Sequence, residues 1–116
     1  MAFYSVSCLL KGVHISRPHL ESLWEENIFL VEAGNENEAK KKGEEYARKD
    51  EAEYEVEDGK PGEPRGKLRW TFMQVESVYD IDTKEIRSGT ELFSRFLRDS
   101  EVSSLLTPFP DERPAG

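Results

Sequence analysis

Few side chains in this sequence are suited to binding a metal ion, and the best three are Cys8, His14 and His19. The two histidines are five residues apart in a segment that we expect to be a loop, and this spacing lacks the paired ligands of a structural zinc site. Cys8 lies in an alternating apolar pattern that turns it inward, where a free cysteine behaves as a small hydrophobic residue. We therefore expect no metal ion and no cofactor.

Covalent catalysis requires a nucleophile with a base beside it. The sequence contains neither the nucleophile-elbow motif nor a cysteine-hydrolase signature. Gly59, Gly62 and Gly66 are interleaved with prolines, and no predicted helix follows them, so they do not resemble a phosphate-binding loop. The sequence thus favours a protein that is not an enzyme and predicts no catalytic residue.

One carboxylate is a candidate for ligand binding. Glu25 and Glu26 are adjacent at the start of a predicted strand, so their side chains point to opposite faces and cannot act as a pair. Glu26 could lie near the aromatic residues Trp70 and Phe72, and these three are our candidates for a groove on the sheet. An ordinary charge or ion pair at the strand edge is the simpler interpretation of Glu26.

An acidic ladder occupies every second position from residue 51 to 57. The acidic side chains are Glu51, Glu53, Glu55 and Glu57, followed by Asp58, and the residues between them are Ala52, Tyr54 and Val56. Such alternation predicts a strand whose charged face points to water. A row of like charges protects a sheet edge from unwanted pairing, and it is also a candidate surface for a basic partner protein.

Aromatic residues are numerous for a small core. They include Trp24, Trp70, Phe72, Tyr79, Phe93 and Phe96. A single helix covers only part of a four- or five-stranded sheet, so some of these side chains should remain on the surface. Because aromatic residues are enriched at protein interfaces, Phe93 and Phe96 are candidate interaction residues.

Composition excludes several function classes. The chain has 116 residues, of which 36% are hydrophobic and 34% charged, and its formal net charge is −8. This charge repels nucleic-acid phosphates, so we expect no nucleic-acid partner. The sequence lacks a membrane-spanning apolar run and a signal peptide, and its single cysteine agrees with a reducing compartment. We therefore expect a cytoplasmic protein without a membrane partner.

The elements that must position these residues follow from periodicity. We predict strands at 3–10, 25–33, 51–57 and 67–81, a helix at 36–49 capped by Asn35, and a loop at 58–66. The consecutive apolar residues 28–31 indicate a strand buried on both faces and hence central in the sheet. A change of apolar face within 67–81 indicates a bulge near Phe72 and Met73.

The end of the chain is less regular. Residues 90–97 carry a helical apolar stripe after a capping box, but they also contain bulky strand formers. A short helix at 100–106 and a proline-rich tail follow. We expect one α+β domain over residues 1–100, with the short helix and tail at 101–116. The domain is predicted as an antiparallel sheet with one main helix on one face, in the order β-β-α-β-β plus a C-terminal strand or helix.

Three segments in this order resemble a family catalogued as domain of unknown function 4288. They are Tyr4-Ser5-Val6, the segment from Trp24 through Ala33 with its following helix, and the segment from Gly89 through Ser100. The resemblance implies a bacterial source and favours a strand at 90–98, but it implies no catalytic residues. Asn27 stands where family members often have arginine, which argues against an essential Glu-Glu-Arg cluster.

Three hypotheses follow. The first is a non-catalytic interaction module that self-associates through its sheet, with a dimer favoured. The second is an acidic protein of the immunity or antitoxin kind that masks a basic partner through residues 51–58. The third is a small enzyme or ligand-binding domain that uses the groove near Glu26 and Trp70.

Overall fold

A computed structural model describes residues 1–107 of the chain. Four strands and two helices occur in the order β1 (Ala2–His14), β2 (Leu23–Ala33), α1 (Glu36–Arg48), β3 (Ala52–Val56), β4 (Gly66–Asp80) and α2 (Asp99–Leu106). The predicted α+β class and element order are confirmed. The proline-rich tail that we predicted falls at 108–116, outside the described residues. Within the described part of the chain, neither helix is long and apolar enough to span a membrane.

The four strands form one antiparallel sheet in the order β2-β1-β4-β3. Strand β2 is therefore an edge strand, and our prediction that it is central was wrong. Its apolar run, residues 28–31, does not mean burial on both faces, because Ile28 and Leu30 are about half exposed while Val31 is buried. The central strands are β1 and β4, which pair along most of their length.

Helix α1 packs on one broad face of the sheet, along part of the length of the strands, and contacts β1, β2 and β4. The predicted cap is present: the Asn35 side-chain oxygen accepts a hydrogen bond of 2.9 Å from the Glu38 amide. Gly43 faces β1 so closely that a Cβ atom there would lie 2.4 Å from Val6 Cγ1. The absence of a side chain at residue 43 therefore allows the helix to approach the strand.

The core lies between α1 and the sheet. Its main side chains come from alternate positions of β1, beginning at Tyr4, and from β2 and α1; the buried cluster is Tyr4, Val6, Cys8, Leu10, Val31, Ala33, Ala39 and Ala47. Cys8 points inward as predicted, and burial together with the charge of Glu44 raises the pKa of its thiol to about 11. Cys8 is thus a core residue.

Strand β4 contains the predicted bulge. Leu10 pairs with Phe72 and Leu9 with Gln74, so Met73 is the extra residue. A second irregularity lies between the pairs Ser7–Ser77 and Cys8–Val75. Two extra residues in β4 explain why its apolar pattern changes face along the strand.

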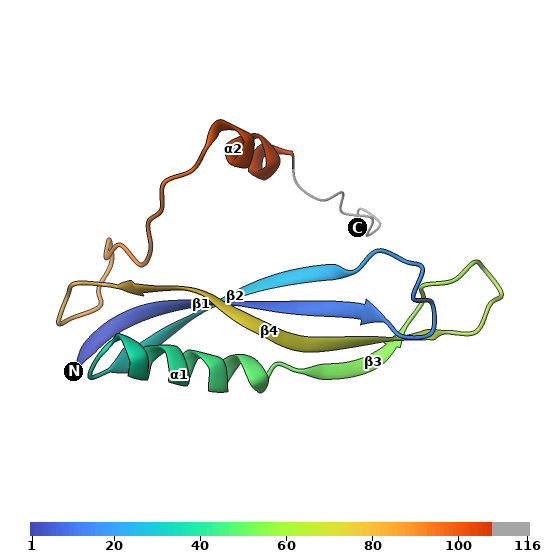
Figure 1. Ribbon diagram of the computed structural model, residues 1–116, viewed down its shortest axis with the longest axis horizontal. Helices are drawn as coiled ribbons and strands as arrows, with labels where there is room; N and C mark the ends of the chain where they lie inside the picture. Colours follow the sequence, from blue (N-terminus) through green and yellow to red (C-terminus); the bar gives the residue numbers. More distant parts are fainter. Residues whose placement is uncertain (108–116) are drawn as a thin grey trace.

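The segment after β4 forms an arm, defined here as residues 83–107. The arm passes over the sheet face opposite α1 and carries α2 (Figure 1). Residues 90–97 form neither the helix indicated by the local pattern nor the strand suggested by the family resemblance. Phe93 packs on Tyr79, but Leu92 and Phe96 of the same stripe are exposed. A short helix whose apolar side is not covered as a whole is not stable. The short helix predicted at 100–106 is confirmed as α2.

Candidate functional site

The sheet face opposite α1, which we call the open face, carries exposed apolar side chains along β2. Trp24, Ile28 and Leu30 occupy alternate positions of this strand and are 55%, 51% and 52% exposed. Their spacing of two or four residues places all three on the same side of the sheet. The open face therefore has an apolar border on the free edge strand.

A polar strip runs beside this border on β1 and β4. Ser5 and Ser7 are almost completely buried, and Ser7 pairs with Ser77 across the two central strands. The Ser7 hydroxyl donates a hydrogen bond of 2.6 Å to the Glu26 carboxylate. Within residues 1–107, the hydroxyls of Ser5 and Ser77 have no hydrogen-bond partner. An unpaired buried hydroxyl is unfavourable, and both of these hydroxyl oxygens are already shielded from solvent within the single chain.

The arm contacts the open face at Tyr79. The rings of Tyr79 and Phe93 lie edge to face with their centroids 5.7 Å apart, and the Ser94 hydroxyl lies 3.5 Å from the Tyr79 hydroxyl. Most other apolar side chains from Leu92 to the end of the arm are exposed, namely Leu92, Phe96, Val102, Leu105 and Leu106, whereas Leu97 is half-buried. No residue of α2 is buried, and α2 packs against no other helix or strand of the described chain.

The three groove candidates do not come together. Glu26 lies on the open face, since it bonds to Ser7. Trp70 and Phe72 lie on the opposite face, where Trp70 donates a hydrogen bond of 2.8 Å to the Tyr54 hydroxyl and the Arg48 guanidinium lies 4.8 Å from the centre of the Phe72 ring. A groove shared by all three side chains is therefore absent from the described chain.

Two of the four glutamates in the acidic ladder pair with basic residues on β4 or just before it. Arg69 donates a hydrogen bond of 2.9 Å to Glu53, and Lys67 lies 3.9 Å from the same carboxylate. Arg65 pairs with Glu57 at 3.1 Å. Glu51 instead accepts a hydrogen bond from the Phe72 backbone amide at 3.0 Å. These contacts reduce the negative potential that the ladder offers to a basic partner.

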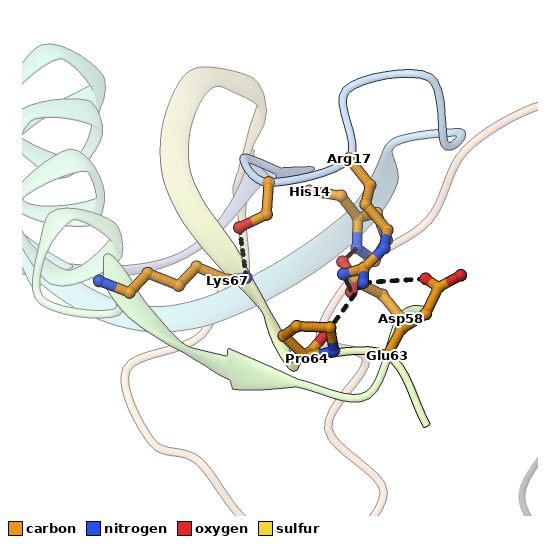
Figure 2. Close-up of polar contacts among 7 residues, drawn as sticks. His14, Arg17, Asp58, Glu63, Pro64 and Lys67 are labelled. Carbon is orange, nitrogen blue, oxygen red and sulfur yellow. Dashed lines mark hydrogen bonds and ion pairs between the residues drawn. The ribbon is translucent and has the colours of Figure 1, made fainter. Parts of the chain in front are cut away.

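Asp58 belongs to a separate polar cluster at one end of the sheet (Figure 2). His14 Nδ1 donates to one Asp58 oxygen at 2.9 Å, and Arg17 lies 2.5 Å from the other. Arg17 also donates to Glu63 at 3.1 Å and to the Pro64 carbonyl at 2.9 Å. We call these five residues the clasp, because they join the β1–β2 connection to the tip of the β3–β4 hairpin.

The chemistry of the clasp is that of a structural ion pair. Burial by itself would raise the pKa of Asp58, but the hydrogen bond from His14 and the charge of Arg17 outweigh it and hold that pKa below its usual value of 3.8. The Asp58 side chain is only 3% exposed, so its two oxygens are occupied by these partners. A carboxylate held in this way fixes a loop in place and is not poised to transfer a proton.

We did not predict Arg17, Ile28 or Leu30 as site residues from the sequence. The sequence does indicate Ile28 and Leu30, because Trp24, Glu26, Ile28 and Leu30 occupy alternate positions of a strand and therefore share one face. The clasp joins residues 41 to 47 positions apart in the chain, and no local pattern marks such a pair.

A comparison with known proteins relates this chain to a protein family. A family model described as Domain of unknown function (DUF4288) matches residues 3–94, which include all four strands, α1 and the first part of the arm. Neither the curated proteins nor the solved structures contain a match.

Proposed function

We propose that this chain, which belongs to the family of domain of unknown function 4288, is an interaction module that associates with a second copy of itself through the open face of its sheet. The single observation that carries the proposal is the exposure of Trp24, Ile28 and Leu30 on one face of an edge strand, with Glu26 between Trp24 and Ile28, opposite the face on which α1 packs.

Two physical arguments support association at this face. Apolar side chains that remain in water lose the free energy that burial would provide, about 1.5–3 kcal/mol for a large side chain that becomes fully covered. Aromatic and aliphatic residues grouped on one strand also resemble the apolar centre of a protein interface more than an ordinary charged surface. The geometry therefore favours an interface above an active site.

The test is the oligomeric state of a variant with Ile28→Lys, measured by light scattering over a dilution series. Ile28 is half exposed, so lysine fits there without disturbing the fold, whereas a charge placed within an apolar interface raises the dissociation constant of the dimer about tenfold or more.

Ala52→Lys is the matched control. Ala52 is also exposed on an edge strand, β3, but it lies on the face that carries α1, since it pairs with Trp70. We expect this variant to associate as the unmodified protein does. A protein that stays monomeric at all concentrations, or a dimer that both substitutions weaken equally, would contradict the proposal.

A further inference from the structure

We infer that the occupant of the open face is the arm of a second copy, so that two chains exchange their arms reciprocally in a twofold dimer. This inference rests on the proposed function and adds the segment that makes the contact. The arm would place Phe96 and the apolar side of α2 against Trp24, Ile28 and Leu30 of its partner.

The first argument is that α2 requires a partner. It has only eight residues, and isolated helices shorter than about 12 residues are marginally stable in water. Its apolar residues Val102, Leu105 and Leu106 are 39%, 55% and 79% exposed, and no helix or strand of the described chain packs on them. A helix of this length is stable only if its apolar side is covered.

The second argument is that the arm and the open face both present exposed apolar side chains. The arm presents Leu92, Phe96 and the three apolar residues of α2, which match the apolar border formed by β2. Aromatic and aliphatic side chains on both surfaces are the composition typical of the centre of a protein interface.

The third argument concerns which copy supplies the arm. Within one chain the contact between Tyr79 and Phe93 already holds the start of the arm over its own open face. A turn precedes this contact, in which Arg87 and Thr90 exchange hydrogen bonds and Gly89 has a φ of +91°. Although the arm is held there, Phe96 is fully exposed and α2 lies apart from the sheet (Figure 1). In the single chain the apolar side chains of the arm and of β2 remain exposed, and an exchange of arms between two copies would cover both sets.

The fourth argument is the size of the contact. Eight apolar side chains per chain are exposed in the two surfaces: Trp24, Ile28, Leu30, Leu92, Phe96, Val102, Leu105 and Leu106. Each removes on the order of 100 Å² from water when it is fully covered. Because a twofold exchange covers both arms and both faces, the apolar part of the interface reaches roughly 1,000–1,600 Å², which is the range of a stable dimer.

The experiment mixes two defective full-length chains. Phe96→Lys damages the arm and leaves the face intact, whereas Ile28→Lys damages the face and leaves the arm intact. Both side chains are exposed, and unchanged far-UV circular dichroism checks that each variant folds. We expect each variant alone to dimerise about tenfold more weakly than the unmodified chain. An equimolar mixture should associate at least about threefold more tightly than either alone, because one of its two arm–face contacts is intact.

Ser88→Lys is the control within the arm, since it adds one positive charge, as each test variant does, at an exposed polar position. It should not weaken the dimer. If only Ile28→Lys weakens the dimer and mixing restores nothing, the two faces pack directly on each other; arm exchange is then wrong and the proposed function stands. If the unmodified chain is a monomer at all concentrations, both are wrong, and an arm that folds onto its own face is the remaining arrangement.

Discussion

At the scale of single residues, the clasp shows how one buried carboxylate can fix two loops. Asp58 is reached by His14 from the end of β1 and by Arg17 from the following connection. Glycines make this close approach possible, because a Cβ atom at Gly66 would lie 2.4 Å from Asp58 Oδ1. The hairpin tip, which contains several glycines and prolines, is thereby held against the β1–β2 connection.

The clasp predicts how Asp58→Asn changes the dependence of stability on pH. The pKa of Asp58 is lower in the folded chain than its usual value of 3.8. Its ionised form therefore stabilises the folded state above pH 3.8, and this contribution is lost as the pH falls through the lower, folded pKa. We expect the asparagine variant to be less stable at pH 7 and to lose less stability on acidification. Urea unfolding at several pH values between 2 and 7 measures both effects.

Glu45→Gln is the matched control, since Glu45 is exposed on α1 and lies away from the clasp. It removes one carboxylate and should change neither the stability at pH 7 nor its dependence on pH by a comparable amount. Equal pH profiles for the Asp58 variant and the unmodified chain would show that the clasp contributes no stability.

At the scale of elements, α1 is the part of the structure that the sequence predicts most accurately. Asn35 caps its first turn, Glu38 accepts a hydrogen bond from the Gly34 amide, and Arg48 pairs with Glu44 near its end. These interactions join residues three or four positions apart, so they are visible in the sequence. Between its turn at residues 87–90 and α2, the described part of the arm has no comparable local hydrogen bonds, and its conformation there depends on contacts with other parts of the fold.

Replacing the cap tests the contribution of this local interaction. Asn35→Ala removes the acceptor of the Glu38 amide, and we expect a loss of about 1 kcal/mol in the free energy of unfolding. Asn37→Ala is the same substitution two residues later, at an exposed position inside the helix, where alanine is the better helix former. Urea unfolding should show destabilisation for residue 35 alone. Equal effects at both positions would contradict the capping role.

At the scale of the whole molecule, shape and charge both bear on association. The chain measures 55 × 31 × 28 Å with a radius of gyration of 17.6 Å, whereas a compact domain of this length has about 13 Å. The arm over the open face accounts for part of this extension (Figure 1). Two copies, each with a net charge of −8, repel each other at long range, so any association must come from short-range apolar contacts.

Charge repulsion opposes association and apolar contacts favour it, so the dissociation constant of the dimer should depend on salt. Salt screens the repulsion between the two acidic copies and leaves apolar contacts in place, so the dissociation constant should fall as sodium chloride rises from about 20 to about 300 mM. Sedimentation equilibrium at several salt concentrations measures this change. A dissociation constant that rises with salt would indicate that ion pairs hold the copies together, as they would hold a basic partner.

The sequence by itself determined the order of the helices and strands and the alternation within β1, β3 and β4. The alternation in 51–57, the cap at Asn35 and the bulge at Met73 are local features, and their residues are close neighbours in the chain. Only the tertiary structure decided that β2 is an edge strand, that Glu26 and Trp70 lie on opposite faces, and that Asp58 meets Arg17. Strand order and register arise from contacts between residues far apart in the chain. Local periodicity gives the two faces of a strand but not its neighbours.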